Sequence, residues 1–184
     1  WNKTERGFRK MEDLQSSVPP EELFIERCLQ FLKPHGKVAI IVPDSILSNP
    51  GKEYIRNWII KHAYVMASIS LPKEAFAPKP MTKTSLLILK KKSPEEIEEE
   101  EKYGLKQYAI PMAIVEKVGK NKRGKPIYRR SPDGRLLMKE VKRMTIFIKE
   151  GKKVRQLASV REPILDDELP DVVEWFKGLG EQVW

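Results

Sequence analysis

Three short apolar runs, rich in β-branched residues, constrain the fold of this chain more than any other feature of its sequence. They are Lys37–Pro43, Ala63–Leu71 and Thr84–Leu89. Runs of this length and composition are typical of buried strands, and the first is continuous enough to be covered on both faces. A helical pattern separates the first two runs, which predicts a parallel crossover, whereas a loop alone separates the last two, which allows antiparallel pairing. The order therefore predicts an α/β fold.

Two helices accompany these strands. The first begins at Ser17–Glu22, where Pro and Glu suit a first helical turn, and ends at Pro34–Gly36. Its predicted buried face is Phe24, Cys28, Phe31 and Leu32. The second helix begins at Asn49–Gly51, after an expected loop from Asp44 to Pro50. Its predicted buried side is Tyr54, Ile55, Trp58 and Ile59. We assign Cys28 and Trp58 to the core because both lie at helical spacing among apolar residues.

The pattern changes beyond residue 92. Glu95–Lys102 is predicted to be a charged helix or a solvated linker, too polar to bury a face. Tyr108–Val118 and Lys125–Arg129 are predicted strands on either side of a turn at Gly119–Gly124. The pattern of Leu136–Ala158 favours neither helix nor strand.

A short amphipathic helix is expected within Asp166–Leu179, with Trp175 assigned to packing. The chain is thus expected to divide into three parts. Residues 1–92 hold the three strands, residues 93–103 form a charged helix or linker, and residues 104–184 form a basic β-rich extension with a C-terminal helix.

Positive charge is concentrated between residues 120 and 155. This stretch holds 14 Lys or Arg against three acidic residues, whereas the whole chain has a formal net charge of +9. A basic block of this kind is typical of surfaces that bind a polyanion, because neutralising phosphates releases condensed counterions. A solvated hairpin rich in Lys explains the same composition equally well.

Several classes of site are excluded by residue content. One cysteine and two histidines rule out a disulfide framework and a zinc site built from Cys and His, and we expect no metal site. No apolar run reaches the roughly 18 residues of a membrane helix. Neither a dinucleotide-binding glycine pattern nor a P-loop is present. The single cysteine favours a reducing compartment, and we expect a cytoplasmic protein. The N-terminus at Trp1 has no signal-peptide pattern and is interpreted as the cut edge of a longer sequence.

Four segments follow one another in a distinctive order: Gly36–Leu47, Ile55–Arg56, Ile69–Phe76 and Thr82–Lys90. Together they resemble the C-terminal half of the catalytic domain of DNA adenine methyltransferases, in particular the modification subunit of type I restriction-modification systems. The resemblance implies a doubly wound, Rossmann-like sheet of seven strands whose last strand is antiparallel. The three strands of this chain would be the fifth, sixth and seventh.

The resemblance also implies a cofactor, S-adenosylmethionine, bound on a Gly-containing loop after the first strand. The target adenine is held by an Asn/Asp-Pro-Pro-Tyr/Phe tetrapeptide after the fourth. Both belong to the part of the family sequence that precedes Trp1, so we expect this piece alone to be inactive. Asn49–Gly51 lacks the second Pro and the aromatic residue of that tetrapeptide and is interpreted as a helix start.

Site residues follow from the same resemblance and from the rule that ligands bind beyond the carboxyl ends of the strands. Phe76 would stack on the flipped-out target base, which loses its stacking partners when it leaves the duplex; the alternative is that it caps the core. The candidate pocket-lining residues are Pro43, Asp44 and Pro72, although a turn or a helix cap is the favoured role for Asp44. The candidates for contacts with the DNA backbone are Lys79, Lys83, Lys120, Lys122, Arg123 and Lys125.

The expected function is therefore part of an S-adenosylmethionine-dependent DNA adenine methyltransferase of the restriction-modification type. Its expected partners are DNA, the N-terminal half of the catalytic domain and a specificity subunit. We expect no association with a membrane. A second hypothesis is a non-catalytic module that binds nucleic acid through the basic block at residues 120–155. A third is a structural remnant whose open sheet edge pairs with another chain.

Overall fold

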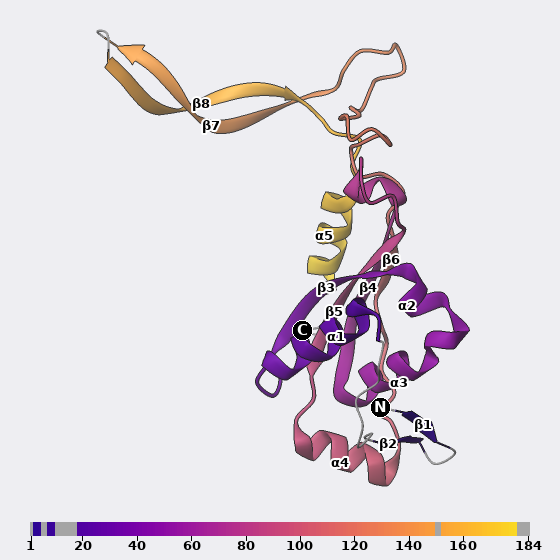
Figure 1. Cartoon of the computed structure of the whole chain (residues 1–184). Helices are drawn as coiled ribbons and strands as arrows, with labels where there is room; N and C mark the ends of the chain where they lie inside the picture. Colours follow the sequence, from indigo (N-terminus) through magenta and orange to yellow (C-terminus); the bar gives the residue numbers. More distant parts are fainter. Residues whose placement is uncertain (1, 5–6, 10–17, 150–151, 180–184) are drawn as a thin grey trace.

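A four-stranded mixed sheet forms the body of the protein. The computed structural model describes residues 2–4, 7–9, 18–149 and 152–179 (Figure 1). The sheet has the strand order β3–β5–β4–β6, with strands β3 (Lys37–Pro43), β4 (Ala63–Leu71), β5 (Thr84–Lys91) and β6 (Met112–Ile114). β5 is antiparallel to both β3 and β4, and β6 is parallel to β4. The predicted α/β class is confirmed, as is the antiparallel pairing of the last two predicted strands.

The sheet packs against helices on both faces. On one face lie α1 (Pro20–Phe31), α2 (Asp44–Ser48) and α3 (Glu53–His62). Their buried residues and those of the strands beneath form the first core cluster: Ile25, Leu29, Val42, Ile46, Ile55, Trp58, Ile59, Ala63, Leu87 and Leu89. On the other face lies α5 (Leu169–Gly178), whose Phe176 joins a second cluster with Ala67, Ile69, Leu71 and Val115. Helices on both faces are the arrangement expected of a doubly wound fold.

A β-bulge lets β4 contribute to both clusters. The pairing register with β5 shifts between Val65 and Ala67. Side chains in a strand alternate faces, so one extra residue reverses which face the following residues use. Val65 accordingly packs against the first cluster, and Ala67 belongs to the second. The backbone N–H of Val65 donates a hydrogen bond to the Tyr108 hydroxyl at 2.8 Å, which satisfies a donor near the irregularity.

The predicted buried face of α1 is wrong in part. Phe24 and Phe31 are 67% and 80% exposed, whereas Ile25 and Leu29 are buried. Leu32 packs against the first cluster as expected. Two apolar stripes share this helix, and they differ by a rotation of about 100°. Spacing alone does not distinguish them.

Glu22 is a buried acid that sequence analysis treated only as a helix-start residue. It is 3% exposed, and its carboxylate accepts hydrogen bonds from Lys52 and from the Tyr54 hydroxyl. These contacts join α1 to the segment around η1 (Pro50–Lys52) and α3. Burial, followed by the bond to Glu22, raises the pKa of Tyr54 to about 12.

Two further expectations for the first strand region are corrected. Asp44–Pro50 is not a loop: Asp44–Ser48 forms α2, and Asn49 then caps η1 by accepting from the Gly51 N–H at 2.8 Å. β3 is covered on one face only, since Ala39 is exposed and Ile41 is 48% exposed. Within the described part of the chain β3 is also an edge strand. The prediction that β3 is covered on both faces is therefore wrong: one face and one edge of this strand are uncovered within the described residues.

α4 (Pro94–Tyr103) is a helix, which is one of the two alternatives expected for this segment, and none of its residues is fully buried. Ser93 and Glu96 form a capping box at its start. Lys92, just before the helix, is 2% exposed. Its ammonium donates to the Ile60 carbonyl at 2.7 Å and forms an ion pair with Glu100. A charged helix can thus be anchored by a buried, fully paired ammonium instead of by apolar contacts.

The rest of the extension is irregular apart from one long hairpin. The predicted strands at 108–118 and 125–129 are reduced to β6 and to isolated bridges such as Val118–Asp167 and Tyr128–Leu165. The ambiguous segment becomes β7 (Met138–Lys149) and β8 (Lys152–Pro163), an antiparallel pair that projects from the body (Figure 1). In α5, Trp175 is 44% exposed and its neighbour Phe176 takes the buried position.

A small hairpin of β1 (Asn2–Thr4) and β2 (Gly7–Arg9) precedes these elements. In the described ranges no helix combines the length and apolar character needed to cross a membrane.

Candidate functional site

The carboxyl ends of β3 and β4 lie at the same end of the sheet, on either side of the start of β5. Pro43 at the end of β3 and Leu71 at the end of β4 both pair with Thr84, the first residue of β5. Pro72 follows Leu71 directly, and the Asp44 N–H donates to the Lys83 carbonyl at 3.0 Å. The three candidate pocket residues are therefore neighbours, as expected from the topology. Their role in binding a base stays a prediction.

Asp44 already has local structural contacts. It is the first residue of α2, where a carboxylate is favoured by the helix dipole. Its Oδ1 accepts from the Ser85 hydroxyl at 3.4 Å, and its backbone carbonyl accepts from the Ser48 hydroxyl at 3.0 Å. These contacts tie the start of α2 to β5 and explain why the chain turns sharply after Pro43.

Thr84 places an unusual polar group at this junction. The residue is only 7% exposed, and its hydroxyl has no hydrogen-bond partner within the described part of the chain. A buried hydroxyl that lacks a partner costs free energy. The sequence makes Thr84 a candidate for a DNA-backbone contact, with a plain strand-start hydroxyl as the equal alternative, but it does not predict that the hydroxyl is buried without a partner.

Phe76 ends η2 (Lys73–Phe76), the short helical turn that follows Pro72. Its ring is partly buried and packs against the second core cluster together with Ala75. The side chain thus has one part against the core and another part exposed to solvent. This geometry is compatible with both interpretations of Phe76, as a cap on the core and as a wall for a base.

The basic turn of the extension packs directly on the loop that follows Phe76. Gly124, in this turn, has φ +74°, and a Cβ built on it would lie 3.1 Å from Pro78 Cδ and 3.2 Å from the Ala77 carbonyl oxygen. Asn121 closes the turn by accepting from the backbone N–H groups of Arg123 and Lys125 at 2.9 and 3.0 Å. The structure therefore brings together cationic residues from the two predicted regions 1–92 and 104–184.

The cationic candidates differ from their basic neighbours in their contacts. Within the described residues no ion pair involves any of the six, and all are exposed: Lys79, Lys83, Lys120, Lys122, Arg123 and Lys125. Lys117 and Arg129, by contrast, pair with Asp166 at 3.2 and 4.0 Å, and Arg129 also pairs with Asp171 at 3.4 Å. The unpaired group is the one available to phosphates.

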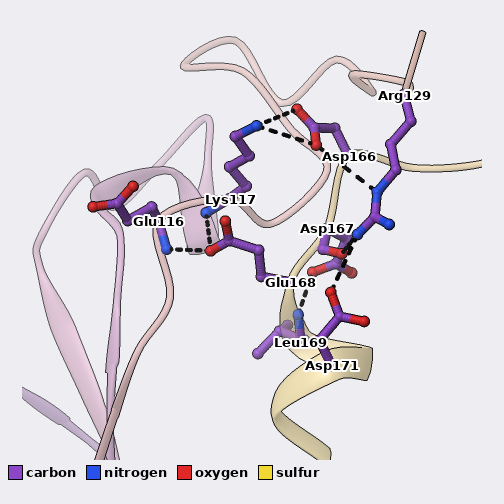
Figure 2. A network of polar contacts seen from close by, with 8 residues as sticks. All are labelled: Glu116, Lys117, Arg129, Asp166, Asp167, Glu168, Leu169 and Asp171. Atoms are coloured by element: carbon purple, nitrogen blue, oxygen red, sulfur yellow. Dashed lines mark hydrogen bonds and ion pairs between the residues drawn. The ribbon is translucent and has the colours of Figure 1, made fainter. Parts of the chain in front are cut away.

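The acidic segment before α5 bonds to the two segments that flank the basic turn at residues 119–124 (Figure 2). Glu168 accepts from the backbone N–H groups of Glu116 and Lys117 at 2.8 and 3.2 Å, and the Arg129 guanidinium donates to the Asp167 carbonyl at 2.8 Å. These contacts join the chain leaving β6 to the start of α5. The acidic residues at 166–171 therefore hold the basic extension in place through these contacts.

Two cavities lie elsewhere. One, lined by Ile60, Lys61, Ile97 and Glu100 among others, sits between α3 and α4. The other is an open groove of about 500 Å³ along β6 and α5, with Met112, Ile114 and Trp175 beside Glu168 and Asp171. No glycine lines either one, and Glu168 is already held by two backbone N–H groups. These residues do not fit S-adenosylmethionine. In the described ranges no group of His, Cys, Asp and Glu is arranged to hold a metal ion.

Comparison with known proteins identifies the family. No curated protein matches the chain. A Listeria monocytogenes protein, assigned as a class I S-adenosylmethionine-dependent methyltransferase, is 24% identical with a TM-score of 0.39; the match covers 50% of this chain and 26% of that protein. The chain therefore spans about a quarter of that protein's length. Residues 2–109 match the family described as N-6 DNA Methylase. This match covers more than half of the chain, which belongs to the N-6 DNA methylase family, whose methyl donor is S-adenosylmethionine.

Proposed function

We propose that this chain supplies the distal part of the catalytic domain of a site-specific DNA adenine methyltransferase, of the kind found as the modification subunit of type I restriction-modification systems. The observation that carries the proposal is the grouping of residues at the end of the sheet where β3 and β4 finish. There the Phe76 loop, the junction at Thr84 and an unpaired basic turn lie together in a chain of the N-6 DNA methylase family.

The chemistry of the target determines which groups the complete active site needs. The exocyclic amine of adenine is a weak nucleophile, because its lone pair is drawn into the ring, so it must be held and aligned by hydrogen-bond acceptors. We assign those acceptors, and the S-adenosylmethionine loop, to segments outside the described residues. The bare edge of β3 and the half-exposed Ile41 beside it support a further strand at this position.

In this proposal Phe76 provides the wall against which the extruded adenine stacks. The four cations of the turn, with Lys79 and Lys83, hold the phosphates on either side of that nucleotide. Recognition of the DNA sequence is assigned to a separate specificity subunit.

The test is substitution of Phe76 in the complete methyltransferase. Phe76→Leu keeps an apolar side chain on the second core but removes the flat face, whereas Phe76→Trp keeps the face. Because stacking on an aromatic ring is worth about 1–3 kcal/mol per base, Phe76→Leu is expected to lower kcat/KM by about 5- to 150-fold, and Phe76→Trp by far less. Thermal unfolding of both variants controls for packing. Full activity of a folded Phe76→Leu variant would show that the ring only caps the core.

The second candidate function is a non-catalytic module that binds nucleic acid through the basic block. It is favoured by the exposure of the turn cations and by their lack of ion pairs within the described residues. It predicts salt-dependent duplex binding that survives Phe76→Leu and is lost when Lys120, Lys122, Arg123 and Lys125 are changed to Gln. The methyltransferase proposal also predicts almost unchanged nonspecific affinity for Phe76→Leu, and it differs in predicting a loss of methyltransferase activity in the complete protein.

A further inference from the structure

The β7–β8 arm has no role in the site described so far. Its two strands pair without interruption from Met138–Pro163 at the base to Lys149–Lys152 near the tip. At roughly 3.4 Å per residue, 12 residues per strand span about 40 Å. The arm leaves the body beside the basic turn and extends away from the sheet (Figure 1). A two-stranded ribbon is marginally stable alone in water, so a partner that covers it would stabilise it.

Charge is distributed unevenly along the arm. Near the base, Arg143 pairs with Glu162 at 2.9 Å, and Arg161 pairs with Glu140 at 3.6 Å. The outer half, residues 144–149 and 152–157, is different: its four cations are exposed and have no acidic partner within the described residues. They are Lys149, Lys152, Lys153 and Arg155. Both acids of the described strands thus lie at the base, where each pairs with an arginine, and the strands of the outer half carry positive charge alone, as complementarity to a polyanion requires.

The register places cations and aliphatic side chains on the same face of the ribbon. Ile146 is paired with Arg155, and Ile148 is paired with Lys153. Residues directly opposite share one face of a ribbon, and so do residues two apart along a strand. Ile146 and Ile148 are 57% and 75% exposed, so this face presents a narrow apolar line bordered by cations.

We propose that the β7–β8 arm is a DNA-binding ribbon that lies in the major groove of the duplex beside the methylation target, with its cations on the phosphates and its apolar line against the base edges. The inference rests on the proposed function for DNA as the substrate. The major groove is about 12 Å wide and admits a two-stranded β-ribbon. An arm of about 40 Å matches about one helical turn of duplex, roughly 34 Å.

The alternative occupant is protein: the acidic, apolar groove beside β6 and α5 on a second copy of this chain. Aliphatic side chains on the arm suit either partner, but the outer cations decide between them. Four unneutralised cations, one on β7 and three on β8, would face a regular array of phosphates in DNA. In the groove they would meet Glu116, Glu168 and Asp171, and Glu168 is already bonded to backbone N–H groups.

The base of the arm allows a clean deletion. The Ile164 N–H donates to the Leu137 carbonyl at 2.8 Å, so the strand ends stay paired when residues 138–163 are replaced by a two-residue Asn-Gly turn. A second variant changes only charge: Lys149, Lys152, Lys153 and Arg155 to Gln. Its matched control removes the same charge from exposed lysines on the body, changing Lys33, Lys102, Lys106 and Lys177 to Gln.

The experiment measures fluorescence anisotropy of the full chain with a labelled duplex of about 30 base pairs, or roughly three turns, over about 50–200 mM salt. Each phosphate contact contributes about 0.9 to the slope of log affinity against log salt, so the four-charge variant is expected to lower the slope by about 3–4. The arm deletion should lower it at least as much, and the body control should leave it nearly unchanged.

A third variant, Ile146→Thr with Ile148→Thr, tests the groove itself. It keeps β-branched side chains and all charges, so the expected result is weaker binding to duplex with an unchanged salt slope. Equal slopes for the wild type and the arm deletion would overturn the inference. So would a chain that sediments as a dimer, becomes a monomer on deletion of the arm and keeps its DNA affinity. Neither result depends on Phe76, whose variants report on the proposed function alone.

Discussion

The ammonium of Lys92 lies 4.6 Å from the centroid of the Tyr64 ring, directly where β5 gives way to α4. The same ammonium donates to the Ile60 carbonyl and pairs with Glu100, and the Tyr64 hydroxyl donates to Glu96 at 3.3 Å. Burial, with the negative charge of Glu96 next in effect, raises the pKa of Tyr64 to about 12. One buried cation thus joins the end of α3, the start of β4 and the acidic helix α4.

Substitution of Lys92 by Met is expected to destabilise the protein strongly. The change leaves the Glu100 carboxylate, whose side chain is 9% exposed, without its cation. Removing one partner of a buried ion pair costs about 3–5 kcal/mol, whereas replacing both partners by apolar residues costs far less. Urea denaturation should therefore show a large loss for Lys92→Met and a partial recovery in the double variant with Glu100→Leu. A double variant no more stable than the single one contradicts this account.

Stability is expected to fall below about pH 6.5 because of His62. Burial is the main cause that lowers the pKa of His62 from its ordinary 6.5, and the nearby Lys61 and Lys92 lower it further. The Trp58 carbonyl and Glu26 act in the opposite direction. Below pH 6.5 the unfolded chain takes up a proton that the folded protein resists, so folding becomes less favourable as pH falls.

His62→Phe is the variant that isolates this effect. The His62 ring stacks on Trp58 with centroids 4.4 Å apart, and a phenyl ring preserves that contact while it cannot titrate. Melting temperatures of both proteins at pH 7 and pH 5.5 should show a smaller decrease for the variant. Parallel decreases would assign the acid sensitivity to other groups.

The unpartnered hydroxyl of Thr84 predicts that Thr84→Val leaves stability unchanged or raises it. Valine has nearly the same shape and removes a buried hydroxyl that has no partner in the described part of the chain. Ser85→Ala is the matched control, because the Ser85 hydroxyl donates to Asp44 at 3.4 Å and its loss should cost about 0.5–1.5 kcal/mol. Chemical denaturation distinguishes the two; a clear loss for Thr84→Val would mean that the hydroxyl has a partner in solution.

Much of the central sheet could be predicted from the sequence, because its strands are continuous apolar runs and their spacing dictates the connections. β5 was expected to be antiparallel, and it is. The inward face of α1 could not be predicted, because Phe24 and Ile25 begin two equivalent stripes and only the sheet beneath selects one. The bulge after Val65 leaves no pattern in the sequence, yet it decides which face Ala67 and Ile69 use.

The residues at the candidate site were partly predictable for a similar reason. The ends of β3 and β4 follow from topology, so Pro43, Asp44 and Pro72 could be placed together in advance. The contact between Gly124 and Pro78 could not, because about 45 residues separate them and neither lies in a regular element. Long-range packing between loops has no periodicity, and it is this packing that brings the basic turn to the Phe76 loop.

The close approach of Gly124 to the loop at Ala77 and Pro78 leads to the last prediction. A Cβ at Gly124 meets backbone and ring atoms at 3.1–3.2 Å and requires a left-handed φ of +74°, whereas Gly134 has φ +84° but nothing within 4 Å. Gly134→Ala therefore carries only the backbone cost, about 1 kcal/mol, and Gly124→Ala carries the steric cost in addition. Because the displaced turn bears Lys122 and Arg123, Gly124→Ala should also weaken duplex binding, as measured by anisotropy, while Gly134→Ala should not. Equal effects of the two substitutions on stability and on binding would show that the turn and the Phe76 loop do not depend on their contact.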